Sequence, residues 1–110
     1  MTASATIFTT AQQTSIATLC LDLSQRLQCT VTAEYGATDC GQHWVALGGP
    51  KMPRGALVSV LAGTGITGPA AVMGADGSPL ADGVEFANAL KTAKSAAVRE
   101  YRAMFKGALH

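Results

Sequence analysis

Two helix-forming segments bracket a strand-forming centre that is rich in glycine and proline, and this arrangement strongly constrains the fold. Residues 48–83 hold all four prolines and nine of the twelve glycines of the 110-residue chain. Glycine and proline interrupt helices and mark turns, so the centre predicts short strands joined by tight connections. The sequence therefore predicts helices that flank a sheet.

The segment before the strands is typical of an amphipathic helix over residues 11–28. Thr10, with Gln13 three residues later, matches a capping box, in which each side chain satisfies a free N–H of the first turn. A short strand over residues 5–9 is predicted before this helix. Apolar residues at three- and four-residue spacing define one stripe of the helix: Ile16, Leu19, Cys20, Leu23 and Leu27.

Four segments between the helices predict strands. Residues 29–35 alternate in polarity and place Val31, Ala33 and Tyr35 on one face. The other three segments are residues 42–47, 56–62 and 70–73. Asp76-Gly77 predicts a turn after the last of them.

A second amphipathic helix is predicted over residues 83–105, with Asp82 and Glu85 as another capping pair and Gly107 as the stop. Alanines at seven-residue spacing form a thin ridge, Ala89, Ala96 and Ala103, which suggests close approach of a second helix. Apolar residues share a separate arc: Phe86, Leu90, Ala93, Ala97, Tyr101, Met104 and Phe105.

The whole pattern predicts a single domain over residues 1–110. We expect a two-layer α+β sandwich with a three- to five-stranded, mostly antiparallel sheet. The N-terminal and the long C-terminal helix should lie on one face.

Composition narrows the function classes. The net charge of +1 gives no global argument for binding nucleic acid or a membrane surface. Residues 55–75 carry no charge, but their five glycines and Pro69 oppose a membrane-spanning helix. Only 14% of residues are charged, which suggests that self-association hides part of the surface. Three cysteines, an odd number, favour reduced thiols and a cytoplasmic location.

The run Gly63-Thr64-Gly65-Ile66-Thr67-Gly68 matches the G-x-G-x-x-G pattern that cradles phosphates. That chemistry requires a helix directly after the motif, since its N-terminus stabilises the pyrophosphate. Here Pro69 and a short strand follow instead. A β-connection is therefore the favoured interpretation, nucleotide binding ranks third among the functions, and no cofactor is predicted.

Asp39, Cys40 and His43 form the densest polar cluster. A thiolate beside an imidazole suggests a nucleophile and its base, and the Cys-x-x-His spacing suggests two metal ligands. The sequence offers neither an oxyanion-hole motif nor a second ligand pair. A turn cysteine and a strand histidine are the favoured interpretation, so no catalytic residue and no metal are predicted.

Basic residues gather on the second helix, where cations also complement the helix dipole. Lys91-Thr92-Ala93-Lys94-Ser95-Ala96-Ala97 resembles the run that opens the last helix of double-stranded RNA-binding domains, and this resemblance implies lysine contacts to phosphates. The turn motif of that family is matched only by residues 41–43, so the chain is not assigned to it. The predicted partner- or phosphate-binding residues are Lys51, Arg54, Lys91, Lys94, Arg99, Arg102 and Lys106.

Residues 70–81, AAVMGADGSPLA, resemble the strand–turn–strand of roadblock-type domains. In that family the hairpin precedes the main run of strands, so the element order differs.

The function expected from the sequence is that of a small cytoplasmic, non-enzymatic binding or adaptor domain. It would act through association with a protein partner or with itself, as a homodimer. The alternative is a nucleic-acid-binding module that uses the basic face of the second helix.

Overall fold

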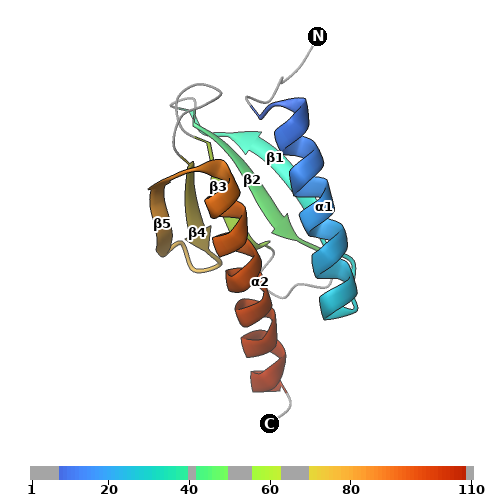
Figure 1. The fold of residues 1–110 in the computed structure, drawn as a ribbon. Helices are drawn as coiled ribbons and strands as arrows, with labels where there is room; N and C mark the ends of the chain where they lie inside the picture. The colour runs from blue at the N-terminus through green and yellow to red at the C-terminus, as the bar shows by residue number, and fades with distance from the viewer. Residues whose placement is uncertain (1–7, 40–41, 50–55, 63–69, 109–110) are drawn as a thin grey trace.

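The computed structural model of the protein describes residues 8–39, 42–49, 56–62 and 70–108, with side chains up to residue 103. The elements run in the order α1 (Thr10–Leu27), β1 (Thr32–Ala37), β2 (His43–Gly48), β3 (Ala56–Leu61), β4 (Ala70–Gly74), β5 (Pro79–Val84) and α2 (Phe86–Ala108) (Figure 1).

Helix α1 begins with a capping box one residue earlier than predicted. The Thr9 hydroxyl accepts from the backbone N–H of Gln12 at 3.1 Å, and the Gln12 side chain accepts from the Thr9 N–H at 2.9 Å. Thr9 is therefore the N-cap and does not end a strand, so the strand predicted over residues 5–9 does not reach it; residues 5–7 lie outside the described ranges. The helix ends at Gln28, whose φ of 55° is left-handed.

The five strands form one antiparallel sheet in the order β1-β2-β3-β4-β5, which confirms the predicted α+β architecture. The hairpin between β4 and β5 turns at Asp76-Gly77, as predicted, and Gly77 adopts a φ of 85°. This hairpin is the segment that resembles roadblock-type domains.

The periodicity of the sequence did not predict strand β5, of which only the first residues fall in the strand–turn–strand resemblance of residues 70–81. This strand overturns the second capping box. Asp82 lies within β5, and α2 begins at Phe86, so Asp82 is not its N-cap. Pro79 and Gly83 obscure the strand pattern in the sequence. Both fit an edge strand: Pro79 is its first residue, and the pairing with β4 contains two irregularities in register.

Both helices lie on one face of the sheet, as predicted (Figure 1). Helix α1 packs on β1 and on α2, and α2 packs on β3, β4 and β5. The alternating strand residues facing the helices are buried, including Val45, Leu47, Val60 and Val72. A bulge opposite Leu47 and Gly48 gives β3 one extra residue, which accounts for two consecutive buried residues in that strand.

The predicted apolar stripe of α1 is buried throughout. On α2, however, the alanine ridge is not a surface on which a helix of another copy packs. Ala89 and Ala96 are 0% and 4% exposed in the core, so only Ala103 of the three is exposed. The close approach that these small residues allow is to the sheet and α1 of the same chain.

Helix α2 is longer than the sheet that it covers. Its 23 residues span about 34 Å, whereas a six-residue strand spans about 20 Å. Its C-terminal part consequently extends past the sheet (Figure 1). Within the described part of the chain, neither helix has an apolar run sufficient to cross a membrane.

Candidate functional site

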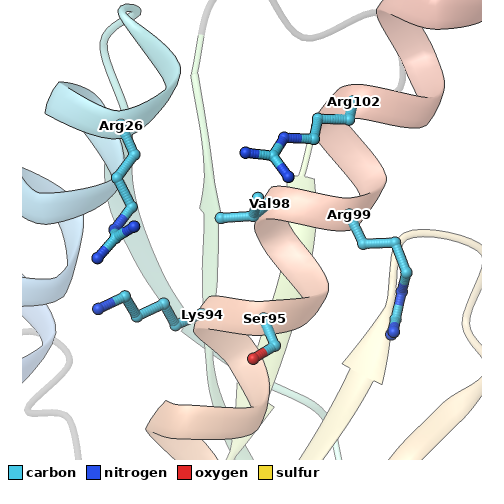
Figure 2. A pocket seen from close by; sticks show the side chains of 6 residues that line it. All are labelled: Arg26, Lys94, Ser95, Val98, Arg99 and Arg102. Carbon is cyan, nitrogen blue, oxygen red and sulfur yellow. The ribbon is translucent and has the colours of Figure 1, made fainter.

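A hollow of about 490 Å³ opens between the C-terminal half of α1 and the middle of α2. The two helices run side by side, with their C-terminal ends toward the same end of the molecule (Figure 1). Four of the six lining side chains are basic, and one of these comes from α1. The lining residues are Arg26, Lys94, Ser95, Val98, Arg99 and Arg102 (Figure 2).

Asp22 joins the two helices at this hollow. Its Oδ1 accepts from Nε of Arg26 at 3.2 Å, and its Oδ2 lies 2.7 Å from Nζ of Lys94. The hydrogen bond from Lys94, helped by the charges of Lys94 and Arg26, holds the pKa of Asp22 below its ordinary value despite some desolvation. The carboxylate therefore stays ionised at neutral pH and keeps the two cations close together.

The local structure at the end of α1 fixes the position of Arg26. The Ser24 hydroxyl donates to the Cys20 carbonyl at 2.7 Å and accepts from the backbone N–H of Val31 at 2.9 Å. The Gln28 N–H also bonds to the Ser24 carbonyl. These bonds tie the last turn of α1 to the segment that enters β1.

Three of the basic residues predicted on α2 line the hollow, namely Lys94, Arg99 and Arg102. Lys94 and Arg102 extend toward Arg26, whereas the guanidinium of Arg99 points to the other side of the helix (Figure 2). Lys91 is exposed and does not line the hollow. Lys51, Arg54 and the side chain of Lys106 lie outside the described residues.

Arg26 is the basic lining residue that the sequence analysis missed. It is the basic residue of the last turn of α1, a position usually assigned to the helix dipole. Only the pairing of α1 with α2 brings it beside Lys94.

A second surface is the open face of the sheet, the face opposite the helices. Two cross-strand rows run over its central strands. The first row is Gly36, Trp44, Leu61 and Ala71, and the second is Glu34, Ala46, Ser59 and Met73. On β2, β3 and β4 these rows carry no charge, and their side chains are partly exposed. The described residues place no helix on this face (Figure 1).

The two rows differ in side-chain size on the central strands β2 and β3. The first row carries the large side chains of Trp44 and Leu61 there and is called the ridge, and the second carries the small Ala46 and Ser59 and is called the trough. The ring of Trp44 lies across Gly36 on the neighbouring strand, because a Cβ on Gly36 would meet Cε2 and Cη2 of the ring at 2.7 Å. A glycine at this register position is therefore what allows the ring to lie on the sheet.

Two large apolar side chains are exposed elsewhere. Leu21, on the outer side of α1, is 67% exposed, and Leu80 on β5 is 38% exposed. The two are on different elements, and neither lies in the two central rows.

The polar cluster singled out in the sequence is only partly described. His43 opens β2 and Asp39 is exposed before it, while Cys40 lies outside the described residues, as does the GTGITG run. Among the described residues, no group of three His, Cys, Asp or Glu side chains is placed to hold a metal ion. Cys20 and Cys29 are free thiols, and burial raises the pKa of Cys20.

Comparisons with protein-family models, with curated proteins and with solved structures find no match for this chain.

Proposed function

We propose that this protein is a non-enzymatic binding domain that acts through protein–protein association, with the open face of the sheet as its association surface. The partner that we propose is a second copy of the same chain. The observation that carries the proposal is that the central strands present only uncharged, mostly apolar side chains on a face that no described helix covers. Contiguous apolar surface of this kind marks interaction sites.

The size of the face suits a reversible dimer. Strands of about 20 Å, side by side at about 4.8 Å, give a footprint of roughly 290 Å² for β2–β4 and roughly 480 Å² for all five strands. Two copies would therefore bury about 1,000 Å² in total, the lower limit for a specific interface, when the outer strands β1 and β5 take part. Such an interface favours a dimer in the micromolar range or weaker.

The difference in side-chain size between the two rows suits a dimer with twofold symmetry. A symmetry axis that lies in the interface and runs across the strands, between the two rows, would place the ridge of each copy over the trough of the other. Leu61 of one copy would then pack on Ser59 of its partner, and the ring of Trp44, which lies over Gly36, would face Ala46 and Glu34. In an interface of this symmetry, the same patch serves both subunits.

Two features of the chain support the proposal further. On β2, β3 and β4 the two rows are uncharged, so these strands of two identical faces can meet without bringing like charges together. Glu34 on β1 is the charged residue of the rows. The overall charged content of 14% is low for a chain that would expose its whole surface. The proposed compartment is the cytoplasm, since two of the three cysteines, Cys20 and Cys29, are free thiols.

A second candidate function is nucleic-acid binding, which the convergence of Arg26, Lys94 and Arg102 favours. That function predicts affinity that falls steeply with salt, because each phosphate contact releases counterions. Binding that is absent, or insensitive to salt, would reject it.

Sedimentation equilibrium with a pair of charge variants tests the association. Ser59→Arg fills the trough and places two like charges near the symmetry axis, so we expect a monomer at concentrations where the wild type is dimeric. Leu21→Arg, the matched control, puts the same charge on the outer side of α1, and we expect it to remain dimeric. A monomeric wild type would refute the proposal, and loss of the dimer in Leu21→Arg alone would move the interface to α1.

A further inference from the structure

We propose that the hollow between α1 and α2 binds the phosphate group of a small anionic ligand. This site lies on the helical layer, away from the open face of the sheet, and does not depend on the dimer. It would make the protein a binding domain with two separate surfaces.

The donors that would meet the ligand come from two helices, and two of the three are held in place by Asp22 before it binds. Asp22 fixes Arg26 through its Nε alone, so the terminal nitrogens of that guanidinium keep their hydrogens for another acceptor. Lys94 is held by the other oxygen of the same carboxylate. Arg102 has no hydrogen bond or ion pair within the described part of the chain, and it extends toward the other two cations (Figure 2).

The charge of the hollow matches a phosphate group. Four basic residues line the hollow, and the guanidinium of Arg99 points away from the other three. Asp22 offsets one of the three positive charges of Arg26, Lys94 and Arg102 and leaves an excess of two beside them. A phosphate monoester carries a charge of about −1.5 to −2 at neutral pH and offers three acceptor oxygens. Guanidinium groups bind such oxygens in pairs, which is why arginines predominate where phosphate is recognised.

The shape of the hollow favours a small ligand over a nucleic acid. Its volume of about 490 Å³ lies within the range of small-molecule sites. None of its six lining residues is aromatic, so it offers no platform for the stacking that single strands require. The basic groups also do not continue along one face, since Lys91 lies outside the hollow and Arg99 points away.

Titration of the full chain with inorganic pyrophosphate, followed by amide chemical shifts, tests the site. At constant ionic strength set with chloride, we expect saturable shifts confined to the last turns of α1 and to residues 94–102. Arg102→Gln should weaken binding about tenfold or more, as the loss of a charge-assisted hydrogen bond does. Arg26→Gln, on the other helix, should have the same effect, and it preserves the test if Arg102→Gln does not fold.

Lys91→Gln is the matched control, because it removes the same charge from the same helix outside the hollow. We expect its affinity for pyrophosphate to stay within about twofold of the wild type, as for an exposed charge. Equal weakening by Lys91→Gln and Arg102→Gln, or no saturable shift up to about 10 mM pyrophosphate, would overturn the proposal. Tighter binding of a short duplex RNA that weakens in Lys91→Gln as well would assign the surface to nucleic acid instead.

The two proposals fail independently in these experiments. Ser59→Arg should abolish the dimer and leave pyrophosphate binding intact, while Arg102→Gln should do the reverse.

Discussion

Replacing Gly36 with alanine tests how Trp44 lies on the open face of the sheet. The added Cβ would overlap Cζ2 of the ring, the nearest atom, and would stand 2.7 Å from Cε2 and Cη2. Carbon atoms in favourable contact are about 3.5–4.0 Å apart, so the ring has to move by about 1 Å or more. Because the ring is the far end of a side chain on an uncovered face, rotation about its own torsions supplies that movement.

Two opposing effects decide the stability of this variant. A ring displaced from its preferred torsions costs about 0.5–1.5 kcal/mol. Alanine in place of glycine within a strand recovers about 0.5–1 kcal/mol of backbone entropy. We therefore expect the free energy of unfolding to change by less than about 1 kcal/mol, whereas overpacking in a closed core typically costs about 1–3 kcal/mol.

Fluorescence reports the movement directly, because Trp44 is the only tryptophan in the chain. In Gly36→Ala we expect emission at longer wavelength and stronger quenching by acrylamide, since the ring is pushed from the sheet toward solvent. Thr32→Ala, an exposed position on the same strand, is the control and should leave the emission unchanged. An unaltered spectrum in a folded Gly36→Ala variant would refute the reasoning.

Three further predictions concern the helical layer. Leu23 is 0% exposed, so Leu23→Ala should lower the free energy of unfolding by about 2–5 kcal/mol in urea denaturation; a loss below about 1 kcal/mol would contradict its burial. Gln28→Gly should raise the free energy of unfolding by about 0.5–1 kcal/mol. The substitution relieves about 1–2 kcal/mol of left-handed strain at Gln28, which exceeds the cost of about 0.4–1 kcal/mol from added backbone entropy in the unfolded chain. A lower urea midpoint would show that the strain is absent. Asp22→Asn should lower the melting temperature at pH 7, and this difference should shrink in acid. The pKa of Asp22 is depressed in the folded state, so its contribution is complete above the ordinary value of 3.8 and is lost as the pH falls through the lower folded pKa. A difference that does not shrink as the pH falls below 3.8 would assign the effect to something other than ionisation.

Periodicity predicted the elements wherever one face of a segment is apolar. The stripe of α1 and the alternation of β1 identify their buried faces, because burial imposes the period of the helix or strand on the sequence. Strand β5 lacks that signal, since it is an edge strand with Pro79, Gly83 and irregular pairing. Strand β5 exists because it pairs with β4, and the local sequence of β5 does not encode that pairing.

The two candidate surfaces depend on register and packing between elements. Lys94 and Arg102 are visible as basic residues in the sequence, but their approach to Arg26 follows from the contact between α1 and α2. The support of Trp44 by Gly36 follows from the pairing of β1 with β2. The prediction from the alanine ridge was wrong for the same reason. Small residues indicate that another element approaches closely, but they do not indicate which element it is.

The dependence of Trp44 emission on protein concentration tests the central claim most directly, because this ring lies on the proposed interface. As the mass rises from the 11.2 kDa of one chain toward twice that value, we predict that emission moves to shorter wavelength, with the same midpoint as the change in mass. Ser59→Arg should show neither change. A mass that doubles while the emission stays constant would contradict association through the open face of the sheet.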